Sequence, residues 1–374
     1  MMLSQKFIVV LLVGLLGGFS VYISVLGALC GLPVPAYLLS YLIILAFFPL
    51  IIKRKYILRF AWSRLLIWVL IVYVLYSVKY SLSHVVAHEK IVNIVYTIVA
   101  PLLIVDLMGG CLQNFSDKIL NAKKNIIFFS KVFMFFSFLL FILGFTVNYQ
   151  TGRYGLVGMI NPIWACRIFA CLTLWIAYQF FYEKKQSFFS GILMLMGMYL
   201  VYKTGSNGPL LVLFLCSLAF FKDSLNLSKI LLILFFLIIA VSIVLLSGRG
   251  AVAMLSSYIL RFEMIEFVLE LALKNIWFGN GIGSFGILFL NADEYYYPHN
   301  LLLEFYIEYG IIGVLLFMLP VLLILRKSSL NYITIATAFY FINSMFSGDI
   351  VGNNFLFIFL YLSSFIVNCK KENT

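Results

Sequence analysis

Residues able to bind anions and to transfer protons gather in one stretch of this chain, residues 247–313. Arg249 and Arg261 carry a planar, permanently charged fork that suits phosphate oxygens. His299 follows Pro298 and precedes the run LLLEFYIEYGIIG, so we expect it at the head of a helix. A helix N-terminus disfavours added positive charge, which keeps an imidazole neutral and able to accept a proton from a hydroxyl. The alternative is a histidine that only caps the helix.

A glycine-rich turn separates these arginines from the histidine. It reads GNGIGSFG at residues 279–286, where Gly281 and Gly283 permit positive φ and expose backbone N–H groups. Such a turn can bind phosphate, although it follows no predicted β-strand, so a dinucleotide-binding fold is not supported. After the histidine, Glu304 and Glu308 are spaced i, i+4 and share one face of the expected helix. We expect that face to line a polar cavity rather than to meet lipid.

Three cations outside this stretch are further candidates for anion binding: Arg153, Arg167 and Lys203. Arg167 lies within the apolar run NPIWACRIFACLTLW, where a charge is costly unless it faces an anion or a cavity. The alternative for each arginine is an ion pair within the protein, for example with Glu304 or Asp349.

Lysines and histidines mark a second polar segment, near residues 79–90. Lys79 and Lys90 flank His84 and His88 there, between two apolar runs. Because such side chains are mostly exposed in proteins, we interpret the segment as a solvated connection.

The composition indicates that these residues belong to a protein embedded in a membrane. Hydrophobic residues make up 64% of the 374-residue chain and charged residues 11%, and the mean hydropathy is +1.09. No soluble fold could bury so much apolar surface, so the chain is predicted to be an integral membrane protein. The net charge of +12 does not indicate nucleic acid, because Lys and Arg lie in short clusters between apolar runs. The six cysteines are scattered, with no metal-ligand spacing.

The apolar runs predict an all-α polytopic fold of about twelve transmembrane helices of about 20 residues each. Residues 1–374 form a single transmembrane domain in this prediction, and one long helical loop, residues 248–299, carries the candidate site. The predicted spans lie near residues 7–29, 35–52, 60–78, 91–109, 126–147, 162–182, 187–202, 208–221, 230–247, 300–325, 331–347 and 351–368.

Positive charges test this span count independently, because Lys and Arg gather in cytoplasmic loops. With Lys6 inside, every loop cluster of Lys and Arg falls on the same side. The clusters are Lys53, Arg54 and Lys55; Lys118, Lys123 and Lys124; Lys184 and Lys185; Lys222 and Lys229; Arg326 and Lys327; and Lys370 and Lys371. We therefore expect both termini in the cytoplasm and the 248–299 loop outside.

Residues 251–275 predict one or two helices that lie along the membrane surface. The expected apolar contacts are Met254, Ile259, Phe262, Ile265, Phe267 and Leu269, and the polar part consists of Arg261, Glu263, Glu266 and Lys274.

The polar motifs follow a fixed order along the chain. An arginine, Arg261, opens the loop helix, a GxGxG-like turn begins at Gly279, His299-Asn300 heads a helix, and Gly310 lies within that helix. TGSNGPLLVL, NPIWACR and SGDIVGNN lie outside this core. The set resembles the C-terminal signature of the O-antigen ligase and O-antigen polymerase superfamily, whose Thr-x-Ser-Arg-Gly segment here has Asn207 in place of its arginine.

The resemblance implies a type C membrane glycosyltransferase that uses polyprenyl-pyrophosphate-linked saccharides and needs no metal or cofactor. In such an enzyme Arg167, Arg249 and Arg261 would neutralise the leaving pyrophosphate, the role that a divalent ion often serves elsewhere. Lys203 would supply the phosphate contact that Asn207 lacks.

We therefore predict a polymerase of O-antigen or a related surface polysaccharide, located in a bacterial inner membrane with its site facing the periplasm. The growing chain on undecaprenyl pyrophosphate would be the donor, and a hydroxyl of a new lipid-linked repeat unit would be the acceptor. His299 would assist that hydroxyl or orient the acceptor. The further candidate substrate contacts are Arg153, Tyr297, Asn300, Glu304, Gly281 and Gly283. Membrane lipid and a chain-length regulator protein are the expected partners, and nucleic acid is not.

Two other functions stay open. A ligase that transfers finished O-antigen to lipid A-core is less favoured, because the loop is compact and one histidine, rather than a His-x-His-Asn pair, precedes the helix. A transporter or flippase of the same lipid-linked sugars would also need arginines in a cavity. Against a transporter, the sequence has no visible inverted repeat and no pair of matching broken helices.

Overall fold

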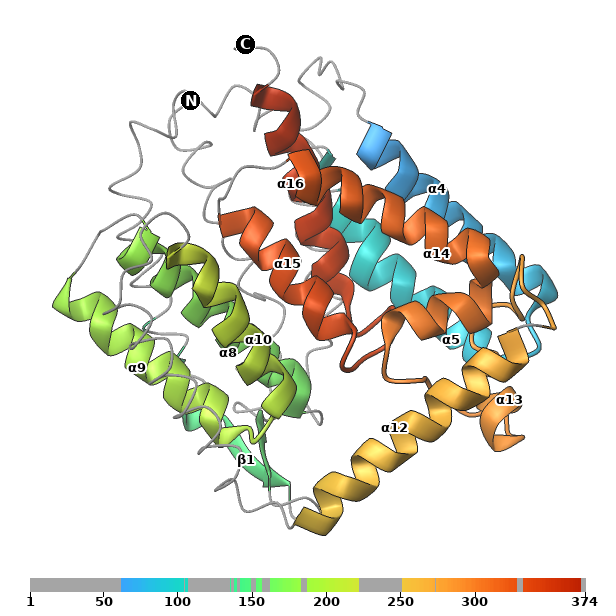
Figure 1. The fold of residues 1–374 in the computed structure, drawn as a ribbon, viewed down its shortest axis with the longest axis horizontal. Helices are drawn as coiled ribbons and strands as arrows, with labels where there is room; N and C mark the ends of the chain where they lie inside the picture. The colour runs from blue at the N-terminus through green and yellow to red at the C-terminus, as the bar shows by residue number, and fades with distance from the viewer. Residues whose placement is uncertain are drawn as a thin grey trace. The chain divides into compact units, whose positions relative to one another are not determined.

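The computed structural model describes residues 62–103, 105–106, 135, 138–139, 142–148, 153–156, 162–182, 187–221, 251–272, 274–327 and 332–370. The chain divides into two compact units, Met1–Ile51 with Asn114–Gly248 and Ile52–Gln113 with Arg249–Thr374. Helices predominate in the described part of both units (Figure 1).

The first unit is built on a buried helix, α8 (Pro162–Ala177), which continues into a π-helical turn, η3 (Tyr178–Tyr182). Proline suits the first turn of a helix because its missing N–H has no intrahelical partner there. α8 packs against α9 (Phe188–Lys203) and α10 (Asn207–Leu218), and α10 ends in a 3₁₀ turn, η4 (Ala219–Phe221). The predicted spans near 162–182, 187–202 and 208–221 are therefore occupied by helices.

A short β-hairpin precedes α8 in the chain. Its strands, β1 (Phe145–Asn148) and β2 (Arg153–Leu156), pair antiparallel with Asn148 opposite Arg153. We predicted a span near residues 126–147, and the described end of this stretch becomes an extended strand from Phe145. A short apolar run of this kind has no periodicity that separates helix from strand.

The second unit begins with α4 (Trp62–Tyr76), a 3₁₀ turn, η1 (Ser77–Tyr80), and α5 (Val85–Ile94), which continues through a π-helical turn, η2 (Val95–Val99). Its C-terminal part consists of α12 (Ala251–Ala272), α13 (Phe285–Leu290), α14 (Leu301–Lys327), α15 (Tyr332–Ser344) and α16 (Asn354–Lys370). α14 lies along α4 and also contacts α12 and α16, so it is the centre of this unit.

Helices long and apolar enough to cross a membrane occur in both units, which identifies a helical membrane protein. Among the described residues there are four such stretches, Trp62–Tyr80, Val85–Leu103, Pro162–Tyr182 and Leu301–Arg326, together with shorter apolar helices. The predicted spans near 7–29, 35–52 and 230–247 lie outside the described residues, as does most of the span near 126–147. The full span count and the orientation of the chain stay predictions.

In the long loop, where we predicted one or two helices over residues 251–275, the chain forms one helix, α12, and one face of it packs on the protein. Met264 and Val268 are fully buried against Phe285 and Ile307. Of the apolar contacts that we predicted for the membrane surface, Ile259, Phe262 and Leu269 are exposed on α12, while Phe267 packs against this core. The contact of α12 with a membrane stays a prediction.

α14 is not a continuous span, because its backbone breaks at Gly310, with φ 65° and ψ −168°. A break inside a helix leaves carbonyl and N–H groups without intrahelical partners, which is costly at membrane depth. Here the loop before α14 supplies them. The carbonyls of Ile307 and Glu308 accept from the N–H groups of Asn280 and Gly281 at 3.0 and 2.8 Å. The N–H of Ile311 donates to the carbonyl of Ile276 at 2.8 Å.

Candidate functional site

The glycine-rich turn is packed directly against backbone. Gly281 has φ +85°, and a Cβ there would lie 2.3 Å from the Cα of Ser81. Its N–H donates to Glu308, and the N–H of Ile282 donates to the hydroxyl of Ser77 at 3.2 Å. Gly283 also has a positive φ, +77°. The geometry therefore gives these glycines a packing role, and the N–H of Gly281 is already used within the protein.

Asn300 is the residue that caps α14. Its Oδ1 accepts from the N–H groups of Leu302 and Leu303 at 2.9 and 3.2 Å, which is the usual N-cap geometry. Its Nδ2 donates to the carbonyl of Met345 at 3.0 Å, so the side chain also holds the segment after α15. Because Asn300 provides the cap, the alternative of a capping role for His299 has no support in this geometry.

His299 lies beside the start of α14 in a left-handed conformation, with φ 54°. Its ring meets the ring of Tyr297 edge-on, with the centroids 4.7 Å apart. Its Nδ1 is buried and has no hydrogen-bond partner among the described residues. Burial, and then the guanidinium of Arg261, lower the pKa of His299 from 6.5 to about 4, while the carboxylate of Asp349 acts in the opposite direction. The imidazole is therefore neutral at physiological pH.

Arg261 and His299 are brought together by a small apolar core. Met264, one turn after Arg261 on α12, packs with Phe285 of α13 and Ile307 of α14. This core fixes the end of α12 against the first turns of α14. The positive charge of Arg261 therefore acts on the imidazole of His299 and helps to lower its pKa.

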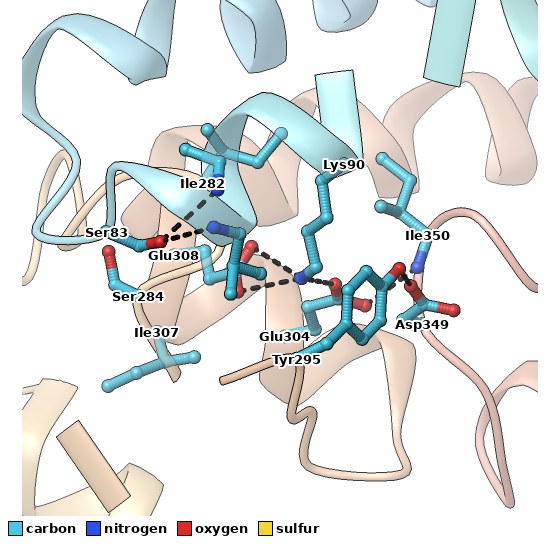
Figure 2. Close-up of polar contacts among 12 residues, drawn as sticks. Ser83, Lys90, Ile282, Ser284, Tyr295, Glu304, Ile307, Glu308, Asp349 and Ile350 are labelled. Atoms are coloured by element: carbon cyan, nitrogen blue, oxygen red, sulfur yellow. Dashed lines mark hydrogen bonds and ion pairs between the residues drawn. The ribbon is translucent and has the colours of Figure 1, made fainter. Parts of the chain in front are cut away.

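The second unit also contains a buried ion-pair cluster. The ammonium of Lys90 lies 2.6 Å from Oε1 of Glu304 and 2.9 and 3.1 Å from the two carboxylate oxygens of Glu308. All three side chains are at most 1% exposed. Figure 2 shows Lys90 extending from its helix to lie between the two carboxylates. The spacing correctly predicted a shared face for Glu304 and Glu308, and that face meets a lysine.

The prediction of a solvated segment around Lys90 is wrong for this residue. Lys90 lies on α5, where Val86, Lys90 and Ile94 share the buried face at i, i+4 and i+8. His84, His88 and Lys79 are exposed, as expected for a solvated connection. A charge on the buried face of an amphipathic helix is stable only with partners, which Glu304 and Glu308 provide.

The start of α5 is fixed by an aspartate from the loop before α14. Asp293 accepts hydrogen bonds from the hydroxyl of Ser83 and from the N–H groups of His84 and Val85. The hydroxyl of Ser83 in turn accepts from the N–H of Val86 at 3.0 Å. These bonds lower the pKa of Asp293, with the bond from Ser83 contributing most. A carboxylate at a helix N-terminus is stabilising, so this contact sets where α5 begins.

A second group of polar contacts, centred on the carboxylate of Asp349, lies next to the ion-pair cluster. The hydroxyl of Tyr295 donates to Asp349, and the other carboxylate oxygen of Asp349 accepts from the N–H of Gly352 at 2.8 Å. Burial raises the pKa of Tyr295, and the negative charge of Asp349 raises it further, so the phenol stays protonated. The N–H of Ile350 donates to Oε2 of Glu304 at 2.8 Å, which joins the two clusters.

The other predicted cations lie in the first unit or outside the described residues. Arg153 is on β2, Arg167 is buried on α8, and Lys203 is the last residue of α9. The ammonium of Lys203 lies 5.6 Å from the centroid of the Tyr199 ring. Arg249 is outside the described residues. Arg261 is thus the predicted phosphate-binding arginine that the structure places near His299.

The comparison with known families agrees with the order of these motifs. Residues 189–318 match the family model described as O-antigen ligase. Over this segment, which is less than half of the chain, the sequence is similar to that family. No curated protein matches the chain. The matched segment contains Arg261, the glycine-rich turn, His299 and the α14 break.

Sequence reasoning missed the roles of two residues in these polar clusters. Lys90 could have been found from its i, i+4 spacing to Val86 and Ile94, which places it among apolar residues. Asp349 was considered only as an ion-pair partner for an arginine. No local pattern connects it to Tyr295, which is 54 residues away in sequence.

Proposed function

We propose that this protein is a membrane glycosyltransferase that polymerises O-antigen or a related surface polysaccharide in the bacterial inner membrane. The neutral imidazole of His299 beside Arg261, within the superfamily segment, is the observation that supports this function best. A neutral imidazole accepts a proton, and a guanidinium binds pyrophosphate through two parallel hydrogen bonds. Both groups can assist a reaction in which a hydroxyl displaces a lipid pyrophosphate.

In the proposed reaction, a hydroxyl of the acceptor saccharide attacks the anomeric carbon of the donor. The new glycosidic bond forms as the bond between that carbon and the phosphate oxygen breaks, and configuration inverts. The hydroxyl proton passes to His299, and undecaprenyl pyrophosphate leaves with the electron pair. Arg261 stabilises the negative charge on the leaving group, which grows as the bond breaks.

Fixed cations replace a divalent metal ion in this proposal. Arg261 contacts the pyrophosphate, and the roles of Arg249, Arg167, Arg153 and Lys203 in binding the same charge stay predictions from the sequence. Treatment of the purified enzyme with a chelator is therefore expected to leave polymerisation unchanged. A strict requirement for a divalent ion would contradict this part of the proposal.

The test is an assay of the purified protein in liposomes with one lipid-linked repeat unit. A ladder of polymers on undecaprenyl pyrophosphate supports a polymerase. The matched variant is His299→Asn, because Asn291 of this chain also adopts a left-handed conformation, with φ 56°. The backbone is therefore expected to tolerate asparagine at this position while the proton acceptor is lost. Loss of a general base typically lowers the rate about 10²- to 10⁴-fold, so full activity of His299→Asn would refute the role.

A ligase is the second candidate, favoured by the description of the matching family model. The same assay separates the two functions when lipid A-core is added as an acceptor, because transfer without chain growth identifies a ligase. A transporter would move the lipid-linked sugar without forming a bond. The α14 break offers little to a transporter, since the backbone groups of Ile307, Glu308 and Ile311 are occupied by the preceding loop.

A further inference from the structure

The segment that leads to His299 is held at both of its ends. Before it, the hydroxyl of Tyr295 donates to Asp349. After it, the side chain of Asn300 donates to the carbonyl of Met345. Both contacts reach the connection between α15 and α16, so the position of His299 depends on where this connection lies.

That connection is itself fixed on α14. The N–H of Ile350 donates to Oε2 of Glu304 at 2.8 Å, and Asp349 is only 2% exposed. The second oxygen of Glu304 lies 2.6 Å from the ammonium of Lys90. A short series of contacts therefore runs from α5 through α14 to the residue that holds Tyr295. Figure 2 shows these side chains side by side.

The ion pairs of Lys90 are not needed for stability alone. A buried ion pair costs much desolvation, and replacing the whole set by apolar residues of similar volume is often neutral or stabilising. An ion pair fixes the relative orientation of the side chains that form it. The ammonium holds Glu304 and Glu308 in one geometry, and it also lies 5.8 Å from the centroid of the Tyr295 ring.

We propose that Lys90 and Asp349 are positioning residues for His299. Lys90 fixes the carboxylate of Glu304, and Glu304 fixes the connection that carries Asp349. Asp349 then holds Tyr295, which begins the segment that presents the imidazole. None of these groups contacts the reacting atoms. They act by keeping the position of His299 and the extent of its burial constant. This inference rests on the proposed function only for its effect on turnover.

The first test compares Tyr295→Phe with Tyr296→Phe. The first substitution removes the hydroxyl that Asp349 holds and keeps the ring. The second removes the hydroxyl of the next tyrosine, whose ring stacks on Phe285 and Phe289. We expect Tyr295→Phe to lower kcat about 10- to 100-fold, the loss that a small misplacement of a catalytic group causes. We expect Tyr295→Phe to bind the donor about as well as the wild type. We expect the kcat of Tyr296→Phe to stay near the wild-type value.

The second readout is the titration of His299 itself, which needs no substrate. The chain has 3 histidines, so His84→Gln/His88→Gln leaves one imidazole signal to follow by NMR. Arg261 and Asp349 are the charged groups that act on this imidazole. Tyr295→Phe loosens the segment and reduces burial, so the pKa of His299 is expected to rise from about 4 toward 6.5.

The role of Lys90 is tested with the triple variant Lys90→Met/Glu304→Met/Glu308→Met, the charge-free set, in which all three charged side chains become apolar. Lys90→Met alone would leave two buried carboxylates without a partner, and the protein could then fail to fold. The charge-free set leaves no unpaired buried carboxylate, and it removes the acceptor for the N–H of Ile350. We expect normal amounts of membrane protein and a raised pKa of His299, as in Tyr295→Phe.

The outcomes separate the inference from the proposed function. A His299 titration that is unchanged in Tyr295→Phe overturns the inference, even if kcat falls, because the hydroxyl would then act on substrate directly. An unchanged titration in the charge-free set excludes Lys90. If the wild-type protein forms no polymer, the proposed function fails while the titration still decides whether these residues position His299.

Discussion

Replacement of Gly310 by alanine tests the contact between the α14 break and the loop before it. Gly310 has φ 65° and ψ −168°, a backbone region that is open almost only to glycine. A Cβ at this position would lie 2.3 Å from the carbonyl oxygen of Trp277 and 2.6 Å from the nitrogen of Phe278. Both atoms belong to backbone, so no side-chain rotation relieves the clash.

The expected cost has two parts. An L-residue in this backbone region costs about 1–3 kcal/mol. Relief of the clash moves the two segments apart and weakens the bonds from Ile311 to Ile276 and from Gly281 to Glu308, both 2.8 Å long. Each such bond contributes about 0.5–1.5 kcal/mol net. Together the two effects predict a destabilisation of about 2–6 kcal/mol for Gly310→Ala.

The assay is thermal unfolding of the purified protein in detergent, with Gly191→Ala as the matched control. Gly191 lies in α9, and a Cβ there would meet nothing within 4 Å. Alanine is the better helix former by about 1 kcal/mol, so Gly191→Ala is expected to unfold at the wild-type temperature or slightly above it. Gly310→Ala is expected to unfold well below it and to lose activity.

Equal unfolding temperatures for the two variants would refute this reasoning. That result would mean that the loop before α14 moves away from the break at little cost. The hydrogen bonds of Asn280 and Gly281 to the carbonyls of Ile307 and Glu308 would then not determine the shape of α14.

Three further predictions concern charge and topology. Because burial holds the pKa of His299 at about 4 in the folded protein, against an ordinary value of 6.5, polymerisation should stay constant as the pH falls through 6.5 and decline near pH 4. The stability contributed by the neutral imidazole is complete above pH 6.5 and is lost progressively as the pH falls from 6.5 to about 4. A rate that halves near pH 6.5 would contradict the burial of His299. Arg261→Lys keeps the charge but not the planar fork, so polymer should be lost while the protein stays in the membrane; wild-type chain lengths would exclude Arg261 from pyrophosphate binding. In a background without native thiols, Tyr258→Cys should react with an impermeant reagent from the periplasmic side and Arg326→Cys should not, and the reverse result would overturn the proposed topology.

Local patterns in the sequence were sufficient for several elements. The apolar run after Pro162 predicted the helical stretch Pro162–Tyr182, because proline suits a helix start and a long apolar run suits a membrane. The helix that we predicted after His299 begins at Leu301, although its cap is Asn300, a role that we had considered only for His299. Glu304 and Glu308 share a face, as their spacing predicted.

The partners of these residues could not be predicted, because they are distant in sequence. Lys90 is 214 residues from Glu304 and 218 from Glu308. Its polar neighbours suggested a loop, and only the fold shows that one face of this short helix is buried. The resemblance identified Gly310, but its reason is a backbone contact with Trp277 that no propensity encodes.

The order of the loop and α14 along the chain has a consequence for how the protein enters the membrane. Residues 276–281 are synthesised before Gly310, so the partners of the broken turn already exist when that turn leaves the ribosome. An interrupted helix that enters hydrocarbon alone exposes unpaired carbonyl and N–H groups at high cost. Here α14 can insert and form those hydrogen bonds with the loop, which has already been synthesised, in one step. A circularly permuted chain with the loop placed after α14 would have to insert the broken helix first, and the translocation machinery would be expected to reject it more often.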